Sequence, residues 1–502
     1  EKYPYICVDE AQDTSKIQHA IIALLASGSE NLFMVGDEDQ SIYGFRAAYP
    51  EALLTFEKNY PDAKVLLMEE NFRSDARIVL AADRFIQKNT LRHEKHMKAA
   101  RKPASDIREI SLRSRKAQYT YLAKLAEGCT SQTAILYRDN ECILPLVDLL
   151  ERNGIPYQMR NAELSFFSHR TILDIINIIK LAQNPMDTEA FLQIYYKIGT
   201  YLRKQDAIRI ARISEEKRIP VLDVAAEDSD LNGHVLGSVR SMRTHLQNLL
   251  QDSGERAIYR IMQFMGYQEY LNRSGLSDSK LEILRILGSR ADSPMELVER
   301  LEQLKVLIRE KEPDRKCPLI LSTIHASKGL EYDSVYLIDV ADGILPESIP
   351  QNLHQASAEE LKAYEEERRL FYVGVTRAKD HLTLFTTNRP STFCSEFLGK
   401  SSVTEEGRKN LMPVESRTSR TFKQARPYAA VAGIRQTKAS EELYFRLKEE
   451  LGTGVIVEHK KYGEGVVTQL DDRLVHIMFQ DDTLRMMNLK ILANAGLLKV
   501  KK

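Results

Sequence analysis

The sequence has few cysteines, no net charge and no long apolar run. Its 502 residues include 5 cysteines, namely Cys7, Cys129, Cys142, Cys317 and Cys394. They are widely spaced and form no Cys-x-x-Cys pair, which is typical of a reducing compartment and excludes a disulfide framework or a cysteine-based zinc site. No apolar run is long enough to cross a bilayer, and no basic-then-apolar leader opens the chain. We therefore expect a cytoplasmic protein without a membrane partner.

The charges balance, because Lys+Arg and Asp+Glu each number 71. This balance excludes a global basic field, so any contact with nucleic acid must come from local patches. With 43% hydrophobic residues, a chain of this length can bury the cores of several domains.

The first candidate site is a pair of adjacent carboxylates, Asp9 and Glu10, that follows the apolar run at residues 5–8. The run has the composition of a buried parallel strand, and such strands present their carboxyl ends to ligands. Asp9 would then help to hold Mg²⁺, and Glu10 would orient or deprotonate the water that attacks a γ-phosphate. The alternative is an acidic turn before a helix, with Asp13 or Thr14 as N-cap. This stretch alone supports the two interpretations equally.

A second apolar run, residues 32–35, breaks into Gly-Asp and leads to Gln40, Tyr43, Phe45 and Arg46. The amide of Gln40 can hydrogen-bond a phosphate or the attacking water. The rings of Tyr43 and Phe45 can stack on unpaired bases, which contributes about 1–3 kcal/mol per base. The alternative is a polar turn whose two rings pack into the core.

A third strand is expected at residues 63–68, before the sequence Asn-Phe-Arg-Ser at 71–74 and a helix over 75–87. This strand-to-helix turn would expose Arg73.

These segments resemble, in order and approximate spacing, the UvrD/PcrA/Rep group of superfamily one DNA helicases. Residues 9–13 resemble motif II, 36–46 motif III and 71–74 motif IV, while 320–331 resemble motif V and 372–379 motif VI. The resemblance implies an ATP-dependent DNA helicase or translocase that acts in DNA repair or replication. It also implies movement in the 3′-to-5′ direction along single-stranded DNA and the unwinding of duplex DNA.

The resemblance assigns roles around ATP and Mg²⁺. Gln40 would sense the γ-phosphate, Phe72 would stack on the adenine, and Glu331 would bind the ribose hydroxyls. Arg73 and Arg377 would act as arginine fingers, a role worth about 10³–10⁵ in rate in related phosphoryl transfers.

The resemblance also assigns Tyr43, Phe45, Arg46 and His325 to DNA. Phe45 stands where many relatives carry Trp, and its smaller face would weaken the base stack without abolishing it. For His325, the alternative is a half-buried polar residue whose ring is satisfied by the backbone.

The expected fold is α/β, with two RecA-like motor domains, an all-helical insertion and a small all-β barrel. The first motor domain would end at residue 65, and the second would comprise 66–160 and 317–390. The helical periodicity between them indicates an insertion over 161–316, which in the family pivots against the motor.

The C-terminal part is expected to be a basic linker over 391–450 and an SH3-like or Tudor-like barrel over 451–502. In the family such a barrel recruits partners, RNA polymerase among them. An appendage without that partner remains the alternative.

Two further charged segments are expected to have no role in the site. Residues 365–369, Glu-Glu-Glu-Arg-Arg, are interpreted as a solvated, ion-paired helical face. The Gly-Lys-Ser at 399–401 lacks the first glycine and the following helix of a phosphate-binding loop, so Gly399 is interpreted as a helix stop.

No G-x-x-x-x-G-K-[ST] loop precedes Asp9. We therefore expect this chain to be a piece of a longer helicase and to be inactive by itself. The alternative is a non-catalytic DNA- or RNA-polymerase-binding protein that keeps a degenerate helicase shell. A helicase–nuclease subunit is a weaker third possibility, since the C-terminal part offers no cluster of carboxylates with a lysine.

Overall fold

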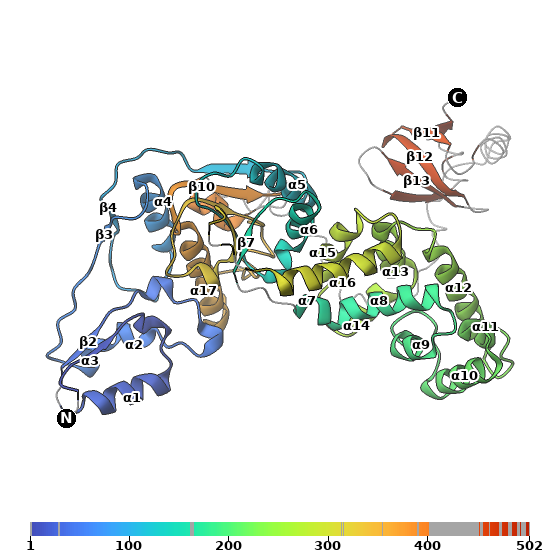
Figure 1. Ribbon diagram of the computed structural model, residues 1–502, viewed down its shortest axis with the longest axis horizontal. Coiled ribbons are helices and arrows are strands. Elements are labelled where there is room, and N and C mark those ends of the chain that lie inside the picture. Colours follow the sequence, from blue (N-terminus) through green and yellow to red (C-terminus); the bar gives the residue numbers. More distant parts are fainter. Residues whose placement is uncertain are drawn as a thin grey trace. The chain divides into compact units, whose positions relative to one another are not determined.

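The structure, a computed structural model, describes residues 3–28, 31–160, 165–312, 314, 316–353, 355–388, 391–400, 451, 455–460, 462–470, 474–479, 484–488, 492 and 498–500. The chain divides into two compact units, residues 1–416 and 417–502 (Figure 1). Most of the expected basic linker, residues 401–450, lies outside the described residues.

A six-stranded parallel sheet forms the centre of the first unit, in the order β5-β10-β9-β6-β8-β7. Its strands are β5 (Arg108–Ser111), β6 (Thr133–Tyr137), β7 (Gln158–Met159), β8 (Leu319–Thr323), β9 (Tyr332–Leu337) and β10 (Ala378–Thr386). Strands from before and after the helical segment are interleaved in this sheet, so two distant stretches of sequence build one sheet. The α/β class expected from the sequence is confirmed.

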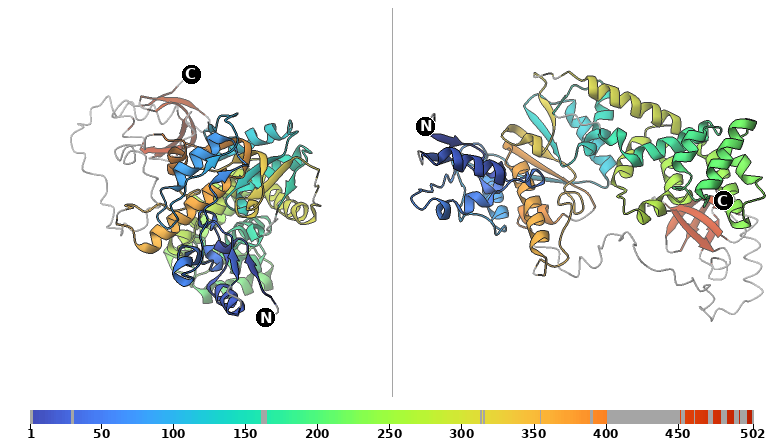
Figure 2. Two further views of the ribbon diagram at one scale, coloured as in Figure 1. Left: turned by 90° about the vertical axis from the view of Figure 1, so that its left-hand side faces the viewer. Right: turned by 90° about the horizontal axis from the view of Figure 1, so that it is seen from below.

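Helices cover both faces of this sheet. Alternate residues of β6 belong to different cores: Ala134 and Leu136 to one, Ile135 and Tyr137 to the other. The first core is covered by α4 (Ala76–Ile86), α17 (Ala358–Val375) and α18 (Thr392–Phe397), and the second by α5 (Arg115–Ala126) and α6 (Leu144–Arg152). Figure 2 shows the same layers from two further directions.

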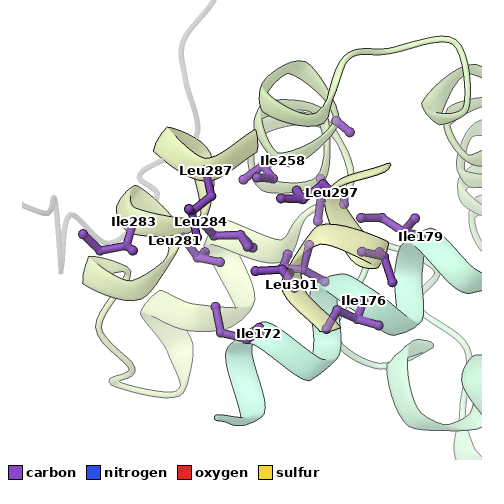
Figure 3. Packing of buried hydrophobic residues seen from close by; sticks show 14 of the residues in the cluster. Ile172, Ile176, Ile179, Ile258, Leu281, Ile283, Leu284, Leu287, Leu297 and Leu301 are labelled. Atoms are coloured by element: carbon purple, nitrogen blue, oxygen red, sulfur yellow. The ribbon is translucent and has the colours of Figure 1, made fainter. Parts of the chain in front are cut away.

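Between β7 and β8 the chain is helical. The helices are α7 (Ser165–Ser168), α8 (Arg170–Gln183), α9 (Thr188–Ile194), α10 (Lys204–Lys217), α11 (Val221–Ala226), α12 (Gly233–Leu249), α13 (Gly254–Phe264), α14 (Tyr267–Arg273), α15 (Ser279–Gly288) and α16 (Pro294–Glu310). Ile172, Ile176 and Ile179 recur at helical spacing on α8 and face Leu297 and Leu301 of α16 (Figure 3). One hydrophobic core joins these helices to α5, α6 and the sheet. Among the described residues no helix is both long and apolar enough to cross a membrane.

The N-terminal part contains a two-stranded parallel sheet and short helices. They are β1 (Ile6–Val8), β2 (Leu32–Met34), α1 (Lys16–Ala26), α2 (Glu51–Leu54) and α3 (Phe56–Asn59). Ser15 caps α1 in a capping box with Gln18, so the alternative interpretation, with Asp13 or Thr14 as N-cap, is wrong.

Residues 6–8 form the expected parallel strand, but the expectation that it is buried is wrong. Tyr5 is 73% exposed and Phe33 of the paired strand is 62% exposed. A sheet of two strands leaves these side chains in contact with solvent.

No strand forms at residues 63–68, where Leu66 and Met68 are more than 80% exposed. The expected strand is wrong, because none of the described strands pairs with this segment. Pairing begins later, where β3 (Glu70–Asn71) lies parallel to β4 (Lys98–Ala99). The expected helix after it is confirmed as α4, with Asp75 as N-cap.

The second unit contains a five-stranded antiparallel sheet in the order β14-β13-β12-β11-β15. Its strands are β11 (Ile456–His459), β12 (Gly463–Leu470), β13 (Leu474–Phe479), β14 (Leu484–Asn488) and β15 (Leu498–Val500). This sheet confirms the all-β class expected for the C-terminal part. Val457, Val467, Val475 and Ile477 are fully buried and form the core of this sheet.

Candidate functional site

The carboxylate pair lies in a strained turn directly after β1. Glu10 has a left-handed backbone, with φ of 51°, and its main-chain N–H donates to Asp9 Oδ1 over 2.9 Å. Gln12, only 1% exposed, donates from Nε2 to Glu10 Oε2 over 2.5 Å and accepts at Oε1 from the main-chain N–H of Asp37 over 2.9 Å. The turn after β1 is thereby fixed to the loop after β2.

A hydrogen-bonded path leads from this loop to Arg377 at the start of β10. Gln40 donates from Nε2 to Asp37 Oδ2 over 2.6 Å, and its Oε1 accepts from Arg377 Nη2 over 3.4 Å. Arg377 is 1% exposed and also donates to the main-chain oxygens of Val373 and Leu330. Burial, together with the charge of Arg73, lowers the pKa of Arg377 to about 10, so its guanidinium stays charged at neutral pH.

Arg73 and Glu331 are in direct contact, although the resemblance gives them separate roles. Arg73 Nε lies 2.9 Å from Glu331 Oε2, and Lys379 Nζ lies 3.3 Å from the other carboxylate oxygen. The hydrogen bond from Arg73 lowers the pKa of Glu331. Phe72 is 71% exposed beside this pair, so its ring is open to a ligand.

Lys328 is a central residue of the site to which the sequence analysis gave no role. Its side chain is 7% exposed, and its ammonium lies 2.7 Å from Asp13 Oδ2, 2.8 Å from the main-chain oxygen of Gln40 and 3.5 Å from Glu10 Oε2. Burial raises the pKa of Asp13 although Lys328 opposes this shift. Lys328 belongs to the motif V segment, but its position in that segment did not show which carboxylate it would meet.

Three aromatic rings gather near Lys328, whose ammonium lies 5.5 Å from the centre of the Tyr43 ring. Tyr43, Phe45 and His325 have ring centroids 5.6–6.1 Å apart, and the Tyr43 hydroxyl donates to the main-chain oxygen of His325 over 3.2 Å. Arg46 lies over the Tyr43 and Phe45 rings, 5.1 and 5.4 Å from their centroids. Phe45 is 68% exposed, so its packing into the core, the alternative from the sequence, is wrong.

His325 is half-buried and uncharged at neutral pH. Burial, and then the charges of Arg138 and Arg46, lower its pKa to about 4, against a hydrogen bond with the backbone of Ile42. The neutral ring therefore offers hydrogen bonds rather than a positive charge.

Arg138 is a second residue without a role in the sequence analysis. It follows β6, whose Tyr137 pairs with Thr323 of β8, and Tyr137 also accepts a hydrogen bond from the main-chain N–H of Ile324 over 2.9 Å. The carboxyl ends of neighbouring parallel strands thus bring Arg138 to the edge where His325 lies.

The charged run at 365–369 is not a solvated face, and that expectation is wrong. Glu365, Arg368 and Arg369 are 3–5% exposed, because α17 lies between the sheet and the loop after β2. Arg369 Nε donates to the main-chain oxygen of Ser41 over 3.0 Å, and Glu366 Oε1 accepts from Gly44 N over 2.9 Å. This helix therefore holds the loop that carries Gln40 and the aromatic rings.

Gly399 ends a helix, as expected. It follows α18 with φ of 66°, the left-handed conformation of a helix stop, and Lys400 is ion-paired with Glu109. Among the described residues, no group of three or more His, Cys, Asp or Glu side chains is arranged to hold a metal ion.

Two models of known protein families match this sequence. The sequence model of the UvrD-like helicase C-terminal domain matches residues 66–389, and that of the UvrD/REP helicase N-terminal domain matches residues 1–61. The chain belongs to the UvrD-like helicase family. The match at residue 1 does not confirm the expectation that part of the N-terminal domain is missing.

Curated relatives agree with this assignment. The chain is 31% identical over 400 residues to the putative ATP-dependent DNA helicase YjcD of Bacillus subtilis, which covers 76% of this chain and 51% of that protein. It is 28% identical over 507 residues to the ATP-dependent DNA helicase PcrA of Staphylococcus epidermidis, and 26% identical over 505 residues to PcrA of Staphylococcus aureus. Both PcrA matches cover 94% of this chain and 67% of the relative. The UvrD-like chain thus spans between half and two thirds of the length of these proteins.

Proposed function

We propose that this UvrD-like protein is an ATP-dependent DNA helicase or translocase that acts in DNA repair or replication. The observation that carries the proposal is the path Arg377–Gln40–Asp37–Gln12–Glu10, made of hydrogen bonds of 2.5–3.4 Å. It joins a buried cation of one RecA-like part to the carboxylate turn of the other. Such a path can report the state of a γ-phosphate from one part to the other.

The chemistry proposed for the first part is activation of water. Glu10 orients or deprotonates the attacking water, and Asp9, whose side chain is exposed at the turn, would hold Mg²⁺ with ATP. When bound, Mg²⁺ would neutralise charge on the phosphates. Asp9 and Glu10 directly follow β1, so two adjacent carboxylates lie at the carboxyl end of this strand, and carboxylate oxygens are ligands that Mg²⁺ accepts.

The second part would supply the cations. Arg377 and Arg73 stabilise the charge that develops on the transferred phosphoryl group, and Phe72 stacks on the adenine. Glu331 would accept hydrogen bonds from the ribose hydroxyls while Arg73 turns from Glu331 towards phosphate. Gln40, already bonded to Arg377 Nη2, would sense the γ-phosphate.

The DNA side would be the aromatic cluster. Bases of a single strand stack on Tyr43 and Phe45, Arg46 binds a phosphate, and the neutral His325 hydrogen-bonds another. Lys328 contacts Asp13 and Gln40 and lies 5.5 Å from the centre of the Tyr43 ring, which links ATP hydrolysis to movement of the stacked bases. The family resemblance supports 3′-to-5′ movement.

The C-terminal unit is proposed to be an SH3-like or Tudor-like barrel that binds a partner, with RNA polymerase as the candidate. The support is a five-stranded antiparallel sheet with its own small core. We also propose that the boundaries between the domains lie at residues 65, 160, 316, 390 and 450. The proposed location of the protein is the cytoplasm.

The test is ATP hydrolysis with and without single-stranded DNA, on the protein as its source organism makes it. We expect DNA-stimulated hydrolysis that Glu10→Gln abolishes while nucleotide and DNA still bind. Glu359→Gln, at an exposed position of α17, is the matched control and should leave the rate unchanged. If ATP is not hydrolysed and nucleotide does not change DNA affinity, a non-catalytic DNA-binding function replaces the proposed one.

A further inference from the structure

One guanidinium nitrogen of Arg138 forms ion pairs with two carboxylates. Its Nη2 lies 2.5 Å from Glu347 Oε2 and 2.7 Å from Glu367 Oε1. One carboxylate balances the charge of a guanidinium, so the second brings a surplus negative charge to this point.

The two carboxylates differ in how they are held. The side chains of Glu367 and Arg138 are only 13% and 12% exposed. The side chain of Glu347 is 70% exposed. Glu367 also accepts, at Oε2, a hydrogen bond from the main-chain N–H of Glu347 over 3.0 Å. Glu367 is therefore the fixed partner. The backbone of Glu347 is anchored while its side chain can leave, because an exposed ion pair contributes only about 0.2–1 kcal/mol.

Arg138, which pairs with Glu347, follows β6 at the end where the neighbouring β8 leads into His325 of the aromatic cluster. Arg138 is close enough to His325 for its charge to disfavour protonation of that ring. On α17, the residue before Glu367 is Glu366, which holds the main-chain N–H of Gly44 between Tyr43 and Phe45. A strand that stacked on these rings would bring its phosphates near Arg138, which is a nearby cation that this arrangement offers.

We propose that Glu347 stands in for a backbone phosphate of a bound single strand. It occupies Arg138 when no strand is present and is displaced by a phosphate oxygen when a strand binds. One negative charge replaces another, so the buried pair of Arg138 and Glu367 keeps the same charge balance in both states. The competition lowers affinity for single strands, and it rests on the proposed function because it requires a strand at Tyr43 and Phe45.

The experiment measures binding of a fluorescein-labelled oligo(dT) to this chain by anisotropy, over a series of salt concentrations. Glu347→Gln keeps the shape of the side chain and removes its charge, so we expect about three- to fivefold tighter binding, the worth of an exposed ion pair. The slope of log affinity against log salt should change by much less than about 0.7, the value for one phosphate contact on a single strand, because the same contact forms in both chains. Glu359→Gln removes the same charge from an exposed site on α17 and should change neither quantity.

A second background tests whether the gain passes through Arg138. In a chain with both Arg138→Gln and Glu367→Gln, which removes the buried pair as a unit, Glu347→Gln should give no gain.

Three results would overturn the proposal. Glu347→Gln could bind like Glu359→Gln, or its gain could persist without Arg138. Either result leaves DNA binding by the aromatic cluster intact. Failure of the unsubstituted chain and of every variant to bind oligo(dT) would overturn both this inference and the proposed function.

Discussion

Lys328 Nζ lies 2.7 Å from Asp13 Oδ2, and this ion pair joins residues 315 positions apart in the sequence. The same ammonium lies 2.8 Å from the main-chain oxygen of Gln40 and 5.5 Å from the centre of the Tyr43 ring. One buried cation therefore touches the carboxylate turn, the loop that would sense phosphate, and a ring that would stack on DNA.

Lys328→Met should uncouple hydrolysis from DNA. The variant keeps the length of the side chain and removes the charge, so we expect DNA-stimulated ATP turnover to fall about 10- to 100-fold, the cost of a displaced positioning contact. Turnover without DNA should fall much less. Lys180→Met, at an exposed position of α8, is the control. Equal loss with and without DNA would contradict the coupling role.

Arg377→Lys should remove catalysis while the fold persists. Lysine keeps a positive charge but cannot donate to Gln40, Val373 and Leu330 at once, so we expect a loss of about 10³ in ATP turnover, the lower end for an arginine finger. Thermal denaturation of the variant checks that the protein is folded. A folded variant with a turnover within tenfold of the unsubstituted protein would exclude this role.

Phe45 offers a direct optical test of base stacking. The chain has no tryptophan, so Phe45→Trp introduces a single fluorescent reporter at an exposed position. We expect oligo(dT) to quench this fluorescence and to bind more tightly than to the unsubstituted chain, because indole has the larger face. Phe45→Ala should weaken binding by about 1–3 kcal/mol. Unchanged fluorescence on saturation would show that the strand does not stack there.

His325 should make stability depend on pH in acid. The pKa of His325 is about 4 in the folded protein, below the ordinary value of 6.5. Between pH 6.5 and pH 4, the unfolded chain therefore binds a proton at this residue that the folded chain does not bind. Stability from this residue is present above pH 6.5 and is lost as pH falls towards 4. Thermal melts at pH 7 and 4.5 should show a larger fall for the unsubstituted chain than for His325→Gln. Equal falls would mean that His325 is protonated as easily in the fold as outside it.

Asp148→Ala should destabilise the contact between α6 and the helical segment. The Asp148 carboxylate is 1% exposed and lies 2.7 Å from Arg300 Nε and 3.0 Å from Arg152 Nε, with Arg290 nearby. Its removal leaves partly buried guanidinium groups without a partner, at a cost of about 3 kcal/mol. Denaturant titration measures this loss against Asp292→Ala, an exposed position before α16. A loss below about 1 kcal/mol would show that the pair is effectively solvated.

The sequence by itself determined the elements and the family. Short apolar runs indicated strands, as at residues 5–8 and 32–35, and helical periodicity indicated the helices between β7 and β8. The predictions failed where burial depended on a neighbour. Residues 63–68 have the composition of a strand, but none of the described strands pairs with them, and residues 5–8 are paired on one side and exposed.

Only the tertiary structure decided how the motif residues meet. The Glu-Glu-Glu-Arg-Arg run at 365–369 has the composition of a surface helix. It is buried because the loop after β2 lies against it. Lys328 and Arg138 lie in recognisable segments, yet their partners Asp13 and Glu347 are some 200–300 residues away, and no local pattern specifies them. Local composition indicates which segments form helices or strands. Charge pairing across the sheet edge depends on the packing of segments that are distant in the sequence.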